Sequence, residues 1–154
     1  MSFRKIDIDA YDEDVIQETE LVEPDPRDPT QVLADAKQKQ ADVRSALARN
    51  DVTGALSIAL DQAPYGPNVD EAKNLTLQTV VSILNSTRSA DIPAVLKDLS
   101  VENQDTLMKY LYKGMAMPGW GDVSGSVLLI WHEKLTEVAG TGCIVRVMTD
   151  RRTV

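Results

Sequence analysis

The sequence is poor in the residues that most covalent and metal chemistry needs. Its 154 residues include one cysteine, Cys143, and one histidine, His132. A lone cysteine excludes a disulfide within the chain, and one cysteine with one histidine is short of the four ligands of a structural zinc site. Such cysteine usage is typical of a reducing cytosol. We therefore expect no metal ion and no cofactor.

Long hydrophobic runs and an excess of basic residues are also absent. No stretch approaches the roughly 20 apolar residues that span a bilayer, and the start, MSFRKIDIDAYDED, lacks the apolar region of a secretory signal. The net charge of −8 would be repelled by nucleic-acid phosphates and by anionic lipid. We expect neither a nucleic-acid partner nor a membrane partner.

The negative charge is concentrated near the N-terminus. Residues 1–29 hold ten acids and three bases, whereas residues 30–154 hold fourteen and thirteen. The boundary is marked by VEPDPRDPT, residues 22–30, whose three prolines lack amide donors and restrict the residues before them. We predict an acidic tail with a stiff, extended linker over 1–29 and a helical domain over 30–154.

Apolar residues beyond the linker recur at helical spacing. The pattern predicts helices over residues 30–49, 51–60, 68–84, 91–99, 100–114, 122–138 and 144–148. Thr30, Asp51, Asn68 or Asp70, Asp91 and Ser100 are candidate N-caps, and Gly140 is a candidate helix end. The β-branched residues of the last segment also allow a strand. Short connections favour antiparallel neighbours, so we expect an all-α fold of about seven helices in an α–α superhelix-like bundle.

Two features suggest chemistry only weakly. The glycine-rich stretch GWGDVSGS, residues 119–126, precedes a helix but lacks the lysine of a phosphate-binding loop, so it also fits a loop with an N-cap at Asp122 or Ser124. His132 and Cys143 could form a base–nucleophile pair, or be a surface histidine and a small buried cysteine. Since no catalytic constellation is evident, the residues alone indicate a helical interaction module.

Two groups of residues could either stabilise the fold or bind a partner, and the sequence does not decide between these roles. Tyr110 and Tyr112 lie on different faces of one helix, so at least one should lie near solvent; they are either core residues with lysine stems beside them or anchors for a partner. Three arginines near Asp150 either complement a helix dipole or meet an acidic partner: Arg146, Arg151 and Arg152.

Four stretches together carry a family resemblance. FRKIDIDAYDED at 3–14, LMKYLYKGM at 107–115, LLIWHEKL at 128–135 and GCIVRVMTDRRTV at 142–154 resemble the 16-kDa subunit of the actin-related-protein 2/3 complex. Their order and spacing match across nearly the whole chain, and the likeness is weaker over 15–50. Four motifs in register are far more specific than one.

The resemblance implies an all-helical, non-catalytic subunit of a cytoplasmic complex that nucleates branched actin filaments in cortical networks. The body would dock on the 20-kDa subunit and the propeller subunit of about 40 kDa, and the N-terminal segment would reach actin-related protein 2. The tail contacts implied are Phe3, Arg4, Lys5, Ile6, Asp7, Ile8, Asp9 and Tyr11. Candidate contacts of the body are Tyr110, Lys113, His132, Arg146 and Arg151.

This role gives the tail's pattern a physical reason. A segment that alternates apolar and acidic residues cannot offset its own ordering entropy, but it can order on a partner with apolar pockets and basic rims. Fully extended, 29 residues reach about 100 Å; as a coil they average roughly 30 Å, which gives an effective concentration of order millimolar. The alternatives are a free helical adaptor whose acidic tail recruits basic partners, and an enzyme that uses Cys143 or the glycine-rich loop.

Overall fold

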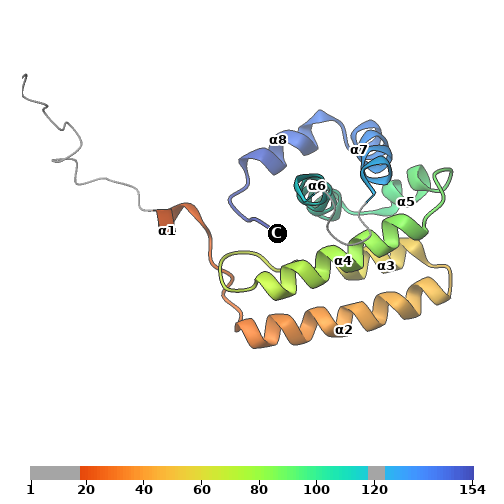
Figure 1. Ribbon diagram of the computed structural model, residues 1–154. Helices are drawn as coiled ribbons and strands as arrows, with labels where there is room; N and C mark the ends of the chain where they lie inside the picture. Colours follow the sequence, from red (N-terminus) through yellow and green to blue (C-terminus); the bar gives the residue numbers. More distant parts are fainter. Residues whose placement is uncertain (1–17, 118–123) are drawn as a thin grey trace, which may run out of the picture.

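The computed structural model describes residues 18–117 and 124–154, and these ranges are helical with connecting loops (Figure 1). The all-α class and the seven helices of the predicted body are confirmed. One further helical turn, α1, lies in the segment that we predicted to be extended. The helices are α1 (Glu18–Leu21), α2 (Pro29–Ala48), α3 (Val52–Leu60), α4 (Asp70–Ser86), α5 (Ile92–Asp98), α6 (Val101–Ala116), α7 (Gly125–Ala139) and α8 (Thr141–Thr149).

Side-chain caps begin two of the helices where the sequence predicted them. The carboxylate of Asp51 accepts a hydrogen bond from the Gly54 amide at 2.8 Å at the start of α3. The hydroxyl of Ser100 accepts one from the Asn103 amide at 3.2 Å at the start of α6. Each bond satisfies an amide that the helix itself leaves without a partner, which explains why the chain turns into a helix at these positions.

Other helix starts differ from the prediction. The N-cap of α2 is Asp28, whose carboxylate accepts a hydrogen bond from the Thr30 amide at 2.8 Å, rather than Thr30 itself. The N-cap of α4 is Val69, without a side-chain cap bond, rather than Asn68 or Asp70. Asp70 lies instead in the first turn, where a carboxylate complements the helix dipole. The sixth predicted helix begins later than predicted, at Gly125, and its N-cap is Ser124, one of the two candidates, without a side-chain cap bond; the other candidate, Asp122, lies outside the described residues.

The last segment forms a helix rather than a strand. Gly140, with φ of +73°, ends α7 and precedes α8, and its amide donates to the Thr136 carbonyl oxygen at 3.0 Å. A left-handed backbone suits glycine at this position, as predicted. Cys143 points into the core while Val145 and Met148, three residues apart, are exposed. This spacing is helical, so α8 packs through one face.

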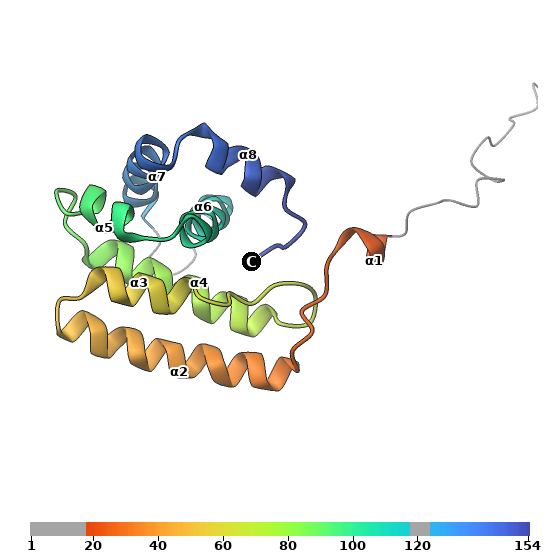
Figure 2. The same cartoon turned by 180° about the vertical axis from the view of Figure 1, so that it is seen from behind.

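The bundle consists of two groups of helices on either side of a shared core (Figures 1 and 2). The helices α2, α3 and α4 follow one another in antiparallel order and pack on each other. The helices α5 to α8 form the other group, in which α6 contacts α7 and α8. Because α6 also contacts α3 and α4, it joins the two groups.

The main core surrounds α6. Leu107, Met108, Tyr110 and Leu111 are at most 1% exposed and together form a wide buried face of the helix. Trp131 of α7 is also 1% exposed, and its indole nitrogen donates to the Leu84 carbonyl oxygen at 3.4 Å. A smaller cluster joins α2 to the start of α4 and consists of Val32, Ala36, Val69 and Ala72.

Tyr110 is a core residue rather than an exposed anchor for a partner, the two roles that the sequence left open. Burial raises the pKa of its phenol, against a smaller lowering by the nearby Thr76 hydroxyl. Within residues 18–117 and 124–154 its own hydroxyl nevertheless has no partner at full hydrogen-bond geometry. Tyr112 is half-buried, and its hydroxyl lies 3.1 Å from Nε2 of His132. The two tyrosines of one helix therefore differ in whether the phenol oxygen contributes a hydrogen bond.

This difference predicts opposite effects of removing the two hydroxyl groups. Tyr110→Phe should leave the free energy of unfolding unchanged or raise it by up to about 1 kcal/mol, because an unpartnered buried hydroxyl is lost. Tyr112→Phe should lower it by about 0.5–1.5 kcal/mol, because the bond to His132 is lost. Urea denaturation of both variants measures the difference; a larger loss for Tyr110→Phe than for Tyr112→Phe would contradict it.

Candidate functional site

The tail residues implied by the resemblance lie outside the described part of the chain. These are Phe3, Arg4, Lys5, Ile6, Asp7, Ile8, Asp9 and Tyr11. The glycine-rich stretch falls outside it as well, apart from Ser124, Gly125 and Ser126. The structure describes the region where the N-terminal segment meets the body, and it describes the surface of the body.

Three segments meet at one end of the bundle, and we call this region the junction. It consists of residues 22–28, the α3–α4 loop at 61–69 and the C-terminal segment 150–154. In Figures 1 and 2 all three lie at the same end, with the C-terminal marker beside the α3–α4 loop. Because these segments are distant in sequence, their contacts are tertiary ones.

The C-terminal segment is attached to α6 at two points. The ammonium group of Lys109 donates to Asp150 Oδ2 at 2.6 Å and to the Arg152 carbonyl oxygen at 3.0 Å. One turn further along α6, Lys113 donates to the Val154 oxygen at 2.5 Å, and Val154 is 8% exposed. The segment therefore lies along α6 in a defined position.

Arg152 connects this segment to the other two parts of the junction. Its guanidinium donates two hydrogen bonds of 2.9 Å to the carboxylate of Glu23, and its Cζ lies 5.0 Å from the centre of the Tyr65 ring. The hydrogen bond from Arg152 lowers the pKa of Glu23 below its usual value. The bidentate geometry sets the direction as well as the distance of the contact.

Residues 25–27 pack against the same loop. The carboxylate of Asp25, with a side chain that is 2% exposed, pairs with Arg27 at 2.6 Å. The guanidinium of Arg27 also donates to the carbonyl oxygens of Gln62 at 3.2 Å and Ala63 at 3.4 Å. The segment that we predicted to be a linker is thus in contact with the body over these residues.

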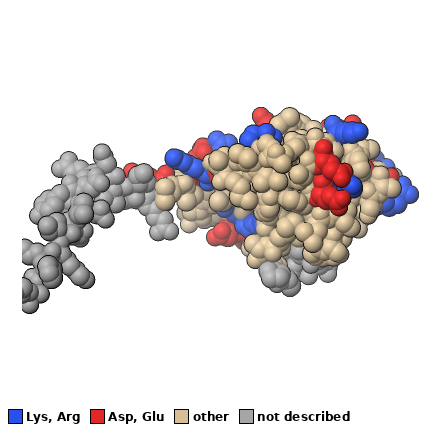
Figure 3. All heavy atoms as spheres, turned by 90° about the horizontal axis from the view of Figure 1, so that it is seen from above, with Lys and Arg blue, Asp and Glu red and all other residues tan. Residues whose placement is uncertain are grey.

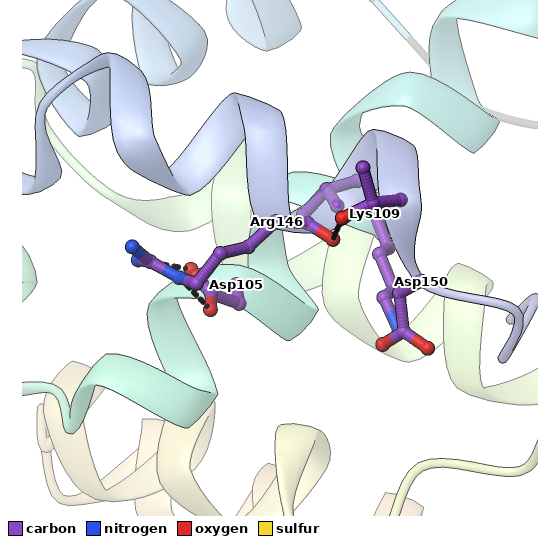
Figure 4. Close-up of a pocket in the computed structure, with 6 residues that line it drawn as sticks. Asp105, Lys109, Arg146 and Asp150 are labelled. Atoms are coloured by element: carbon purple, nitrogen blue, oxygen red, sulfur yellow. Dashed lines mark hydrogen bonds and ion pairs between the residues drawn. The ribbon is translucent and has the colours of Figure 1, made fainter.

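A shallow pocket lies between α6 and α8 (Figure 4). Arg146 donates two bonds, of 2.6 and 2.8 Å, to Asp105 at one end, and Lys109 meets Asp150 at the other. Burial alone would raise the pKa of Asp105, but the hydrogen bonds from Arg146 and Cys143 lower it. Since its charged groups are paired with each other, the pocket offers no free charge to a ligand.

The other predicted site residues are spread over the molecule. His132 lies on α7, and its ring meets that of Tyr112 edge-on at 5.5 Å. Cys143 is fully buried on α8 and its thiol faces the Gln104 carbonyl oxygen at 3.8 Å. The structure does not pair Cys143 with His132, and burial raises the thiol pKa to about 12. A thiol that stays protonated is a poor nucleophile.

The surface of the body holds one feature that the sequence analysis did not identify. Four large apolar side chains are exposed on α7 and α8, at 37–66%: Leu129, Ile130, Val145 and Met148. Figure 3, which views the molecule from above Figure 1, shows uncharged surface on that side, interrupted by a cluster of acidic side chains and by several basic ones. We call this surface the α7–α8 face. Each helix also has a buried side, so the sequence pattern alone did not separate the two faces.

Within the described ranges, no helix has the length and apolar content needed to cross a bilayer. No group of three or more metal-ligating side chains was found among these residues either.

The Asp105–Arg146 pair predicts a pH-dependent contribution to stability. A carboxyl group whose pKa is lowered by folding stabilises the fold above its unfolded pKa of about 4, and this contribution is lost as the pH falls through the folded pKa. Asp105→Asn should lower the melting temperature by about 2–4 °C at pH 7. The difference from the wild type should close between about pH 4 and pH 2.

Calorimetry from pH 7 to pH 2 measures this difference. Asp98→Asn, which removes an exposed carboxylate at the end of α5, is the matched control and should change the melting temperature by less than half as much. A deficit of Asp105→Asn that stays constant down to pH 2 would show that the ion pair is not its source.

Comparisons with known proteins agree over the whole chain. Residues 2–154 match the family model described as ARP2/3 complex 16 kDa subunit (p16-Arc). The chain is 37% identical over 152 residues to actin-related protein 2/3 complex subunit 5 of Saccharomyces cerevisiae, covering 99% of this chain and 97% of the relative. It is 36% identical to subunit 5-C of Xenopus laevis and 32% identical to the human subunit 5-like protein, with 99% of this chain and 94% of each relative covered. The chain therefore belongs to the family of 16-kDa subunits of the actin-related-protein 2/3 complex.

Proposed function

We propose that this protein is a non-catalytic structural subunit of the actin-related-protein 2/3 complex and supports the nucleation of branched actin filaments. The observation that carries the proposal is the family match over residues 2–154, together with relatives that are named as subunits of that complex. It works in the cytoplasm, in cortical actin networks. In this proposal its activity consists of binding other subunits, as the description of its family as a subunit of a complex suggests.

In this proposal the helical body, residues 30–154, docks on scaffold subunits through the α7–α8 face. Apolar side chains such as Val145 and Met148, which are 61% and 66% exposed, bury their surface only when a partner covers them. The partners are the 20-kDa subunit and the propeller subunit of about 40 kDa. Of the body residues that we expected at interfaces, Arg151 is exposed, Arg146 is held by Asp105, and Tyr110 is only 1% exposed.

The N-terminal segment, residues 1–29, tethers actin-related protein 2. Phe3, Ile6, Ile8 and Tyr11 are its apolar anchors, and the acidic side chains between them orient the segment on a basic rim. Because the segment is covalently joined to a docked body, a weak contact suffices to retain the partner. A tether of this kind holds a subunit while leaving it free to move.

Deleting residues 1–21 tests the tether. The body should fold and dock normally, because Glu23 and the junction stay in place, while actin-related protein 2 should dissociate about tenfold faster or more. Retention of that protein on immobilised complex, measured as a time course, reports the difference. Phe3→Ser, Ile6→Ser and Ile8→Ser together keep the length and the charge and should reproduce the loss. Unchanged retention and unchanged nucleation in both variants would remove the tether from the proposal.

A single charge on the α7–α8 face tests the docking surface. Val145→Glu should weaken binding of the body to scaffold subunits by about tenfold or more, because the carboxylate loses its water in the interface. Ala41→Glu, on the exposed side of α2 in the opposite group of helices, is the matched control and should bind as the wild type does. Co-purification of the other subunits measures both. Equal binding by the two variants would place the interface elsewhere, and a soluble monomer without partners would favour the free adaptor.

A further inference from the structure

We infer that Arg152 positions the N-terminal segment: it holds Glu23 against the body and, together with the contacts of Arg27 to the α3–α4 loop, makes the segment leave the body at residue 22 instead of at the start of α2. The positioning is a property of this chain alone. Only its consequence for tethering rests on the proposed function.

The first step of the argument is that Arg152 is itself held in place. Its backbone amide donates to Asp150 Oδ1 at 3.0 Å, and its carbonyl oxygen accepts from Lys109 at 3.0 Å. Lys109 is in turn paired with Asp150 at 2.6 Å. Residues before and after Arg152 are therefore fastened to α6, and less side-chain freedom is lost when its guanidinium binds.

The second step is the contact with Glu23, which joins residues 129 positions apart. Both hydrogen bonds measure 2.9 Å, and the face of Tyr65 lies 5.0 Å from the guanidinium carbon. The arginine thus links the N-terminal segment, the α3–α4 loop and α6. A lysine could not reproduce this geometry, because it lacks the planar fork.

The third step is the close approach of residues 23–25 to the α3–α4 loop. Gly66 has φ of +80°, and a Cβ atom there would lie 2.9 Å from the Asp25 amide nitrogen and 3.0 Å from the Glu23 carbonyl oxygen. Only glycine fits this backbone and this gap. The backbone of the α3–α4 loop therefore lies directly against residues 23–25. The hydrogen bonds between Glu23 and Arg152 hold the same residues from the C-terminal segment.

The neighbouring arginine provides a contrast. Arg151 is exposed, and the structure records no hydrogen bond or ion pair from its guanidinium to any described residue. Its charge acts on Glu23 only at longer range. Two adjacent arginines with the same charge therefore differ in whether they hold the N-terminal segment, which makes each the control for the other.

The consequence for the tether is a shorter segment with a defined origin. Counted from residue 22 instead of residue 29, its full reach falls from about 100 Å to about 75 Å. Its effective concentration rises about 1.5-fold from length alone. Because Glu23 and Arg152 are about half exposed, salt screens their contact, and the segment can be released without unfolding the body.

Pulsed electron paramagnetic resonance on the full-length chain tests the inference. Nitroxide labels at Leu21→Cys and Gln78→Cys, both at exposed positions, report the distance from the N-terminal segment to α4. The native Cys143 is fully buried, so it reacts little with the label. The labelled chain is compared with versions that carry Arg152→Gln, Arg151→Gln, or the charge exchange Glu23→Arg with Arg152→Glu.

We expect a narrow distance distribution in the labelled chain and in Arg151→Gln, and a distribution at least about twofold broader in Arg152→Gln. Raising the salt to about 1 M should broaden the first two in the same way. The charge exchange should restore the narrow distribution. A broad distribution in the unsubstituted chain, equal effects of the two arginines, or no recovery on charge exchange would each overturn the inference. Circular dichroism checks that Arg152→Gln is folded. If it is not folded, the salt dependence of the unsubstituted chain and the result of the charge exchange decide whether the inference stands.

The inference and the proposed function can fail separately. If Arg152→Gln broadens the distribution but the tail deletion leaves actin-related protein 2 in place, the positioning stands and the tether falls. If the tail deletion releases that protein while Arg152→Gln leaves the distribution unchanged, the tether stands and the positioning falls.

Discussion

Four side chains of α6, Leu107, Met108, Tyr110 and Leu111, are almost completely excluded from solvent, and this burial constrains the rest of the molecule. A helix with so wide a buried face needs several neighbours to cover it, and α3 and α4 pack on it from one group and α7 and α8 from the other. Two of its polar residues, Lys109 and Lys113, hold the C-terminal segment alongside. The junction thus depends on the position of α6.

Local signals were sufficient to predict much of the fold. The caps Asp51 and Ser100 and the helix end at Gly140 act through neighbouring residues, so their chemistry can be read from a few positions. The strand alternative for α8 could not be removed in this way, because β-branched residues satisfy both patterns. It was decided by the burial of Cys143 on one helical face.

The candidate site was less accessible to prediction, because its contacts join distant parts of the chain. Arg152 and Glu23 gave no local indication that they would meet, and neither did Arg146 and Asp105. Tyr110 illustrates the same limit, since helical spacing places it on a side that only tertiary packing reveals to be covered. The apolar pattern of α7 and α8 could not show which of their two apolar sides would remain exposed. The family, in contrast, was evident from four motifs, and the comparisons confirm it.

The proposed role combines a fixed body with an N-terminal segment that binds a neighbouring subunit. Lys5 is the only lysine among residues 1–29, so amine cross-linking of the purified complex, read by mass spectrometry, reports where that segment lies. The account predicts cross-links from Lys5 to actin-related protein 2. Cross-links from Lys5 only to lysines of this chain's own helices would contradict it.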